Sequence, residues 1–312
     1  MNNVIYKGEK FKVYILNQYN GLASTPLKHL EIRFRDINSI NEIEGLSELK
    51  GLQSLNLFGN HIVDMSGLEE LTNLKLLYIG NRISEIRGLE KLTKLTHLWL
   101  ESEISEIKGL VNLSNLTYLT LRGNFSVIKG LENLSNLTDL TLGGNISEIN
   151  NLDNLTNLSS LNLSYNQISE IKGLGELRNL RSLYLSDNQI TEIKGLNLLE
   201  KIYNLDLSAN RISEIKELSQ LRNLTQLNLS FNEIQEIKGL EGLKKIMNLD
   251  LRVNQITEIK GVKSLTGLHR LDLCSNQITS VKEVDYLYEF DIDLYFNPIS
   301  QVEIMRFKGY VK

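Results

Sequence analysis

Leucine and isoleucine recur along the chain at fixed distances, and an asparagine stands at one fixed place among them. The clearest copy has Asn188 within the apolar series Leu174, Leu177, Leu180, Leu183, Leu185, Ile190 and Ile193. Further copies begin 22 residues apart at Leu196, Leu218 and Leu240. A fixed period of this length indicates a solenoid, in which each coil contacts only its neighbours. Function is therefore expected on a long repeat surface rather than in a catalytic cleft.

Each repeat predicts one short strand and a return path of tight turns. In the L-x-L segment the two leucines point inward and the residues beside them point outward. After the asparagine, apolar residues lie three apart, which suits 3-10 turns because their side chains eclipse every three residues. The predicted fold class is an α/β solenoid with the form of a horseshoe or arc. It has a concave parallel sheet of about 13 strands and a 3-10 or irregular convex side.

The asparagine position is expected to be buried, with its side-chain amide and carbonyl bonding backbone groups where the chain leaves the strand. Ser102 and Arg35 stand at this position in two coils, and Asn124 and Asn145 in two others. Serine replaces the amide only in part, so the coil of Ser102 is a predicted weak point. The N-x-S/T sequons that the repeat generates are interpreted as by-products rather than glycosylation sites.

Some coils are one residue shorter than the others, and the short ones cluster between Asn60 and Asn166. Aligned on the asparagine position, the missing residue lies just before Asn81 and Ser102, and just after Asn124 and Asn145. We expect these deletions to change the local twist and to open a recess on the concave wall. Uniform curvature through these coils would contradict that expectation.

The ends of the array are expected to carry caps, because a terminal coil would otherwise expose leucines and an unpaired sheet edge. Residues 1–26 predict a β-hairpin cap, 27–299 the repeat array and 300–312 a helical cap. The hairpin would pair Val4–Tyr6 with the segment 11–16. Ser300 and Glu303 match a capping box for the terminal helix, with an apolar side from Val302, Met305 and Phe307 and an end at Gly309. With both caps the chain is expected to be complete.

Charge and composition favour a cytoplasmic monomer that binds neither nucleic acid nor membrane. The net charge is −4 and the pI is about 5.7, which disfavours anionic partners. The first 25 residues hold no apolar core of signal-peptide length. The single cysteine, Cys274, excludes an internal disulfide.

Motifs for enzymatic chemistry are missing from the sequence. There is no phosphate-binding glycine loop, no G-x-S-x-G and no H-E-x-x-H. The histidines fall in separate coils, so no metal or cofactor site is expected. Cys274 has no histidine on the adjacent strand to act as its base. We therefore expect a non-enzymatic protein, and we interpret the repeated E-I-K-G segments as a solvated convex face.

Outward strand positions form two zones that are candidates for partner binding. The first is aromatic and contains Phe58, Leu76, Tyr78, His97, Trp99, Tyr118 and Arg122. Clustered exposed aromatics are the composition of an interface hot spot, although they also pair well across strands. The second is acidic and contains Asp206, Asp250, Asp272, Asp291 and Asp293, with Tyr184, Arg252, Arg270 and Tyr295 among them. It could steer a basic segment of a partner, or its charges could simply oppose sheet aggregation.

The 22-residue pattern, with asparagine at its centre and I-x-x-I-x-x-L after it, resembles one subclass of leucine-rich repeats over roughly residues 27–299. That subclass occurs in cytosolic regulatory subunits of protein phosphatase 1 and in internalin-type bacterial surface proteins. Asn297–Ile299, followed by a short helix, is similar to the terminal cap of the cytosolic group. The resemblance implies an interaction scaffold or regulatory subunit that binds a partner protein on its concave face, and its cytosolic group implies a Ser/Thr phosphatase as that partner. The alternative is a secreted or cell-surface adhesion module of the internalin type.

Overall fold

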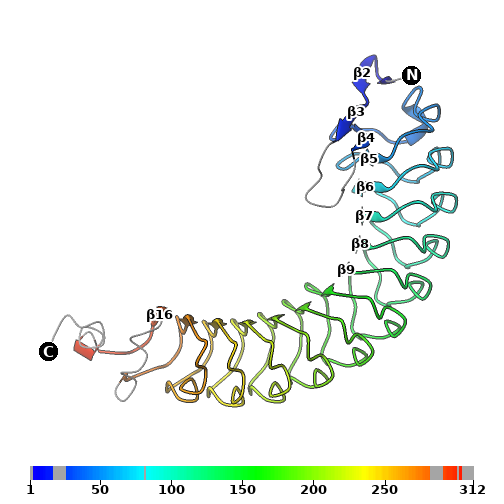
Figure 1. The fold of residues 1–312 in the computed structure, drawn as a ribbon. Coiled ribbons are helices and arrows are strands. Elements are labelled where there is room, and N and C mark those ends of the chain that lie inside the picture. Colours follow the sequence, from blue (N-terminus) through cyan, green and yellow to red (C-terminus); the bar gives the residue numbers. More distant parts are fainter. Residues whose placement is uncertain (1–2, 17–25, 81, 282–290, 301, 304–312) are drawn as a thin grey trace. The chain divides into compact units, whose positions relative to one another are not determined.

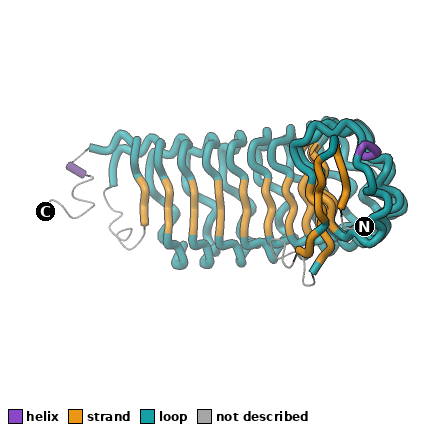
Figure 2. The backbone as a smooth tube through the Cα atoms, turned by 90° about the horizontal axis from the view of Figure 1, so that it is seen from above, coloured by secondary structure: helices purple, strands orange, loops and turns teal. Residues whose placement is uncertain are grey.

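The computed structural model describes residues 3–16, 26–80, 82–281, 291–300 and 302–303. The chain forms two compact units, Met1–Ile146 and Ser147–Lys312. Each unit is a solenoid of coils with one short strand per coil (Figure 1). Figure 2 shows that loops and turns make up most of each coil and that helix is almost absent from the described residues. The predicted solenoid is confirmed.

In the first unit the strands are β3 to β9, together with a separate hairpin. The strands of the hairpin are β1 (Asn3–Tyr6) and β2 (Glu9–Lys12), which pair antiparallel. Strand β3 (Tyr14–Leu16) pairs antiparallel with β4. The parallel strands that follow are β4 (Leu27–Glu31), β5 (Ser54–Asn56), β6 (Leu76–Gly80), β7 (His97–Glu101), β8 (Tyr118–Arg122) and β9 (Asp139–Gly143). A 3-10 turn, η1 (Ile40–Glu42), lies between β4 and β5.

In the second unit seven strands pair parallel in sequence order. They are β10 (Ser160–Asn162), β11 (Ser182–Tyr184), β12 (Asn204–Asp206), β13 (Gln226–Asn228), β14 (Asn248–Asp250), β15 (Arg270–Asp272) and β16 (Asp291–Asp293). With β4 to β9 of the first unit, these agree with the predicted number of parallel strands. The solvent side of these strands is called the sheet face, and the opposite side of each coil the turn face.

The core of each coil is built from the leucines and isoleucines of the repeat. Leu183, Leu185 and Ile190 are fully buried, and the equivalent residues of other coils are buried to the same degree. Burying each such side chain on folding contributes roughly 1.5–3 kcal/mol to the free energy of unfolding, before the loss of conformational entropy is subtracted. The repeat therefore supplies one continuous apolar interior within each unit.

The turn face is held by backbone hydrogen bonds between residues three apart, as the three-residue apolar spacing predicted. Leu177 N donates to Leu174 O at 3.0 Å, and Leu180 N donates to Leu177 O at 2.9 Å. These bonds span three residues, which is the 3-10 pattern. Exposed asparagines join successive turns, for example Asn115 Nδ2 to Thr93 O at 2.8 Å and Asn136 Nδ2 to Ser114 O at 2.8 Å. The N-L-S/T segments therefore have a structural role in the turns.

A second, buried asparagine ladder runs through the second unit, as predicted. Asn188 Oδ1 accepts from Ile168 N of the preceding coil at 2.9 Å. Its Nδ2 donates to Leu163 O of that coil and to Leu185 O of its own coil. The same bonds are made by Asn210, Asn232, Asn254 and Asn276. Each asparagine thus satisfies buried backbone groups of two coils.

The prediction that Ser102, Asn124 and Asn145 occupy this ladder is wrong. In a regular coil Asp187 N donates to Ser208 O and Gln189 N donates to Ile168 O, one on each side of Asn188. In the short coil Gly123 N donates to Gly143 O, and the very next residue, Asn124, donates to Ile104 O. Ser102 and Asn145 show the two halves of the same short pattern, donating to Arg122 O and Phe125 O. The residue missing from these coils is the buried asparagine itself, and the side chains of Asn124 and Asn145 are exposed.

The buried apolar position gives the correct alignment of the short coils. Ile62, Ile83, Ile104, Phe125 and Ile146 are all buried and follow one another at intervals of 21 residues. The strands of these coils, β6 to β9, are five residues long, whereas β5 and β10 to β16 are three residues long. Deleting the asparagine therefore lets the parallel ladder continue by two residues. The predicted recess stays a prediction.

Regular coils turn out of the strand through a residue with positive φ, and short coils do not. Tyr165, Asp187, Ala209, Phe231 and Val253 have φ between 52° and 59°. Gly123 and Gly144 replace such residues in short coils, where a Cβ would collide with Ile104 O and Phe125 O respectively. At Gly123 and Gly144 glycine is therefore needed for space rather than for backbone conformation, whereas Ser102 occupies the equivalent position of another short coil.

The ends of the chain differ in detail from the expected caps. The hairpin turn is Lys7–Gly8, and residues 14–16 leave the hairpin to pair with β4. The Arg35 side chain is exposed and pairs with Glu9 at 3.3 Å, while Arg35 N donates to Asn60 Oδ1 at 2.9 Å. Glu303 N donates to Ser300 Oγ at 3.2 Å, as in the first half of a capping box. Met305, Phe307 and Gly309 lie outside the described residues, and the boundaries at 26 and 299 stay predictions.

Candidate functional site

The aromatic zone lies on the sheet face of the first unit, on the consecutive long strands β6 to β8, except for Phe58, which follows β5. Tyr78 of β6 is in register with Trp99 of β7, and the ring centroids are 6.5 Å apart. Trp99 is 42% exposed although it is large and apolar. Leu76, His97 and Tyr118 are in register with one another, two residues before Tyr78, Trp99 and Thr120. We call Tyr78, Trp99, His97 and Tyr118 the aromatic row.

The row has exposed and buried members. Tyr118 is 37% exposed and its ring stacks on His97 at 4.5 Å with an interplanar angle of 11°. Leu76 and His97 are buried, at 2% and 8% exposure. Neither side chain offers much contact area itself. Trp99, Tyr118 and the half-buried Tyr78 supply the accessible surface.

His97 is neutral, and one of its ring nitrogens is a buried hydrogen-bond acceptor without a donor in the described part of the chain. Thr96 Oγ1 donates to Lys75 O at 3.1 Å, so its oxygen accepts from His97 Nδ1–H at 2.8 Å. Nε2 then bears the lone pair, and it has no hydrogen-bond partner among the described residues. Burial lowers the pKa of His97 to about 4 because the charged imidazolium would lose hydration. An unpaired buried acceptor costs on the order of 1–3 kcal/mol.

Glycines let larger side chains lie flat beside the aromatic row. The Phe58 ring occupies the space where Gly80 would carry a Cβ. Phe34 meets Phe58 edge-on at 6.3 Å, and the Arg33 guanidinium lies 5.1 Å from the Phe34 ring. Arg122 packs on Gly143, with Cγ 3.3 Å from the position of a Cβ there. Sequence reasoning omitted Phe34, although an exposed phenylalanine just before the asparagine position was a usable signal.

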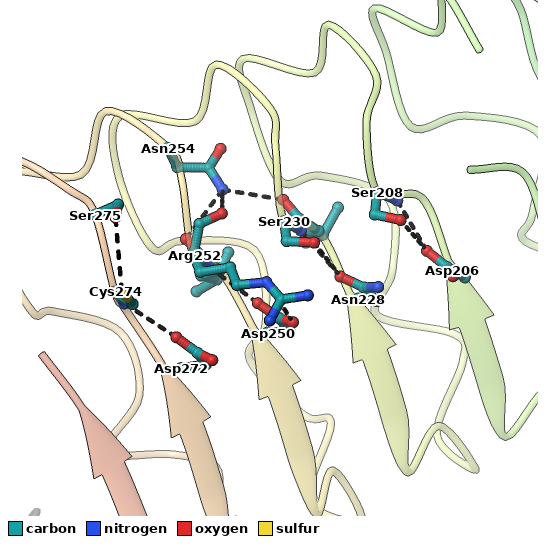
Figure 3. A network of polar contacts seen from close by, with 12 residues as sticks. Asp206, Ser208, Asn228, Ser230, Asp250, Arg252, Asn254, Asp272, Cys274 and Ser275 are labelled. Carbon is teal, nitrogen blue, oxygen red and sulfur yellow. Dashed lines mark hydrogen bonds and ion pairs between the residues drawn. The ribbon is translucent and has the colours of Figure 1, made fainter. Parts of the chain in front are cut away.

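The acidic zone lies on the sheet face of the second unit, at the ends of successive strands. Asp206 Oδ1 accepts from Ser208 N at 3.0 Å and from Ser208 Oγ at 2.7 Å (Figure 3). Asp250, Asp272 and Asp293 accept in the same way from the backbone N–H two residues later. Asn162 and Asn228 make the same bond in their coils. We call this series of Asp and Asn side chains, which Tyr184 interrupts in the coil of β11, the cap column.

Part of the cap column lines a depression of about 400 Å³ on the sheet face. Its wall runs from Tyr184 of β11 to Asp272 of β15 and includes Asp206, Asp250 and two arginines, Arg252 and Arg270. Asp272 is only 7% exposed. Asp293 and Tyr295, which is 65% exposed, are not among the lining residues of this depression. Of the residues named from the sequence, Tyr184, Asp206, Asp250 and Asp272 therefore line the depression, and Asp293 and Tyr295 do not.

Charges in the depression are only partly compensated. Arg252 Nε lies 3.4 Å from Asp250 Oδ2, and its guanidinium lies 5.8 Å from the Phe231 ring. Arg270 Nε lies 4.0 Å from Asp291 Oδ2. Burial raises the pKa of Asp250, with a further contribution from Asp272, while Arg252 and Arg270 act in the opposite direction. No ion pair in the described part of the chain involves Asp206 or Asp272.

Catalytic and metal-binding arrangements are not found among the described residues. No group of three or more His, Cys, Asp and Glu there could hold a metal ion. Cys274 N donates to Asp272 Oδ1, and its thiol lies 3.6 Å from Ser275 Oγ. In the same described part, no helix has the length and apolar character needed to cross a membrane.

Comparisons with known proteins agree with this architecture. The family model for Leucine Rich repeats (2 copies) matches residues 72–112, 156–198 and 204–245. An internalin (inlF) from Listeria monocytogenes is 32% identical, with a TM-score of 0.81, over 91% of this chain and 85% of that chain. Internalin C2 (inlC2) from the same organism is 27% identical with a TM-score of 0.54, over 61% of this chain and 83% of that one.

A more distant structure shares only the fold. The leucine-rich-repeat ectodomain of the Arabidopsis thaliana receptor kinase GASSHO1/SCHENGEN3, in complex with Casparian strip integrity factor 2, is 23% identical with a TM-score of 0.65. The alignment covers 85% of this chain and 35% of that chain. A search of the curated proteins gave no match.

Proposed function

The chain belongs to the leucine-rich-repeat family, and from that premise we propose that it binds a partner protein on the sheet face of its first unit. Proteins of this family generally mediate protein–protein interaction, and their fold is typically a non-enzymatic scaffold. The proposal adds a location, the aromatic row, and names Trp99, Tyr78 and Tyr118 as anchors. Phe58 and Arg122 border the row, while Leu76 and His97 are buried and offer little surface.

The exposure of the Trp99 ring is the observation that carries the proposal. Trp99 is 42% exposed beside the half-buried Tyr78 and near Tyr118, so water contacts a contiguous aromatic surface. Tryptophan and tyrosine are enriched among residues that dominate binding energy, because they bury a large area with few rotatable bonds. Five-residue strands hold these rings on a rigid ladder, so little ordering entropy is lost on binding.

The test is a pull-down that compares wild-type protein with Trp99→Ala and Tyr78→Ala variants. The matched control is Tyr203→Ala, because Tyr203 is 45% exposed and lies in the second unit. We expect one or more captured proteins to be lost with the first two variants and retained with the control. Equal recovery of every protein by all variants would contradict the proposal.

The relationship to an internalin favours a recognition module of the internalin type as the finer function. The phosphatase-regulator hypothesis has no comparable support, and it stays a prediction. Mixing the chain with the catalytic subunit of protein phosphatase 1 and measuring co-elution tests it directly. A stable complex that depends on Trp99 would restore it.

Location and oligomeric state also stay predictions from the sequence. A cytoplasmic monomer predicts one copy per particle in light scattering and recovery in the cytosolic fraction. A secreted or surface-bound internalin-type module predicts recovery in the medium or on the cell surface. Fractionation with an antibody to the chain separates these two outcomes.

A further inference from the structure

The cap column of the second unit carries more negative charge than its structural role requires. Asp206, Asp250 and Asp272 each use Oδ1 to accept the N–H two residues later. Asn162 and Asn228 do the same with a neutral amide oxygen. An Asp side chain and an Asn side chain therefore serve the turn equally, and the carboxylate charge needs another explanation.

The charges also carry a cost in the free chain. Parallel pairing puts Asp250 directly opposite Asp272, and Asp272 directly opposite Asp293. Like charges opposite one another on adjacent strands destabilise a sheet. Asp272 is 7% exposed, so its carboxylate also loses much of its hydration. Asparagine at these positions would keep the cap and remove both penalties.

Compensation by the chain's own cations is incomplete in the depression. Arg252 forms an ion pair with Asp250 and contacts the Phe231 ring, and Arg270 lies near Asp291. The described residues supply no ion pair to Asp206 or to Asp272. Both carboxylates line the depression, and Figure 3 shows them at the ends of their strands on either side of Asn228 and Asp250.

We propose that this depression binds a lysine or arginine side chain of a protein partner. The cation would lie beside Asp206. Asp272 is three strand spacings away, about 14 Å, and would attract a second basic residue of the same partner, in the register that Asn228 and Asp250 fix between them. Tyr184 is in register with Asp206 and lines the same depression, so its ring can support the cation from one side. A volume of about 400 Å³ admits a long side chain with its flanking backbone.

This site rests on the second unit alone and does not depend on the aromatic row. The probes are fluorescein-labelled hexalysine and hexaarginine, with binding to the full chain measured by fluorescence anisotropy. We expect both peptides to bind, and the dissociation constant to rise about tenfold in the Asp206→Asn/Asp272→Asn double variant. Asn228→Asp adds a carboxylate to the column while keeping the cap, so we expect it to bind more tightly than wild type.

The control must change the net charge equally at another place. Glu192→Gln/Glu236→Gln removes two carboxylates that pair with lysines of the repeated E-I-K segments. Binding within about twofold of wild type is expected for this variant, because exposed charges at a distance are screened. An equal loss in the control, or no binding of either peptide to the wild-type chain, would overturn the proposal.

Two further measurements keep the result interpretable. Thermal unfolding of Asp206→Asn/Asp272→Asn should match wild type or exceed it, because asparagine preserves both caps. Trp99→Ala should bind hexalysine as wild type does, so failure of the aromatic row and failure of this site give different results. A loss of peptide binding in Trp99→Ala would contradict the assignment to the second unit.

Discussion

The short coils of the first unit and the regular coils of the second unit bury the same apolar positions but leave their strands differently. A regular coil turns out through a residue with positive φ and then ties its backbone to a buried asparagine. A short coil omits that asparagine, passes close to the preceding coil at Gly123 or Gly144, and gains two residues of strand. The regular coil is stabilised by hydrogen bonds to a buried side chain, and the short coil by a longer ladder of backbone hydrogen bonds.

This difference also separates the two candidate surfaces. The long strands of the first unit display Tyr78, Trp99 and Tyr118, whose rings lie across neighbouring strands. The short strands of the second unit end at the cap column, where each Asp or Asn is occupied by its own turn. A surface of apolar rings therefore accompanies the long ladder, and a surface of fixed polar groups accompanies the tight turn.

The largest expected effect comes from removing one buried asparagine. Asn188→Ala leaves Ile168 N, Leu163 O and Leu185 O without their side-chain partner, and we expect a loss of about 3 kcal/mol in unfolding free energy. Asn124→Ala should change it by less than about 0.5 kcal/mol, because the Asn124 side chain is exposed. Chemical denaturation of both variants measures the contrast. Equal losses would show that the short coil has an asparagine ladder after all.

A pH titration tests the buried histidine of the first unit. The pKa of His97 is about 4 in the folded chain against an ordinary value of 6.5, so the unfolded chain binds the proton more readily between these values. Above pH 6.5 His97 is neutral in both states and has no effect on stability. As the pH falls toward 4, the free energy of unfolding decreases by about 2–3 kcal/mol. Fluorescence of Trp99, the single tryptophan, reports unfolding in this unit. His97→Phe should reduce this dependence, and an unchanged pH profile would contradict the assignment.

Glycine substitution tests the close path of the short coils. Gly123→Ala would place a Cβ against Ile104 O and the Ile104 side chain, and we expect a loss of about 2 kcal/mol. Gly51→Ala is the matched control in the same unit, since its Cβ would meet only Lys28 Nζ at 3.5 Å. Thermal melts of the pair measure the difference. If both variants melt alike, close approach does not explain the glycine at position 123.

The smallest effect is expected in the second unit and has the opposite sign in pH. Burial raises the pKa of Asp250, so the folded chain holds this proton more readily than the unfolded chain. Its ionisation is unfavourable at neutral pH, and the penalty disappears as the pH falls through the raised pKa. Asp250→Asn should stabilise the chain by less than about 1 kcal/mol at neutral pH, because solvent and Arg252 screen the carboxylate. Urea titrations at neutral and acid pH measure this gain, and destabilisation at neutral pH would contradict it.

Sequence periodicity predicted the coil, its inward leucines and the bonding of Asn188, because each depends on spacing within one repeat. It misplaced Ser102, Asn124 and Asn145, since alignment on an asparagine letter cannot tell a buried amide from an exposed one. The apolar series from Ile62 to Ile146 contained the correct period, because a core position tolerates no shift. The burial of Leu76 and His97, and the caps made by Asp206 and Asp250, depend on contacts across strands or on turn geometry. A repeat count does not supply them.

The buried asparagine ladder gives the second unit a direction. Each amide serves backbone groups of the coil before it, as Asn188 does for Ile168 and Leu163, some 20 to 25 residues earlier. Removing the last coil of such a stack leaves exposed polar groups on the coil that remains, whereas removing the first coil leaves an asparagine still bonded within its own coil. During synthesis a coil is complete only when the following one has left the ribosome. Assembly from the amino end and fraying from the carboxyl end are the expected consequences.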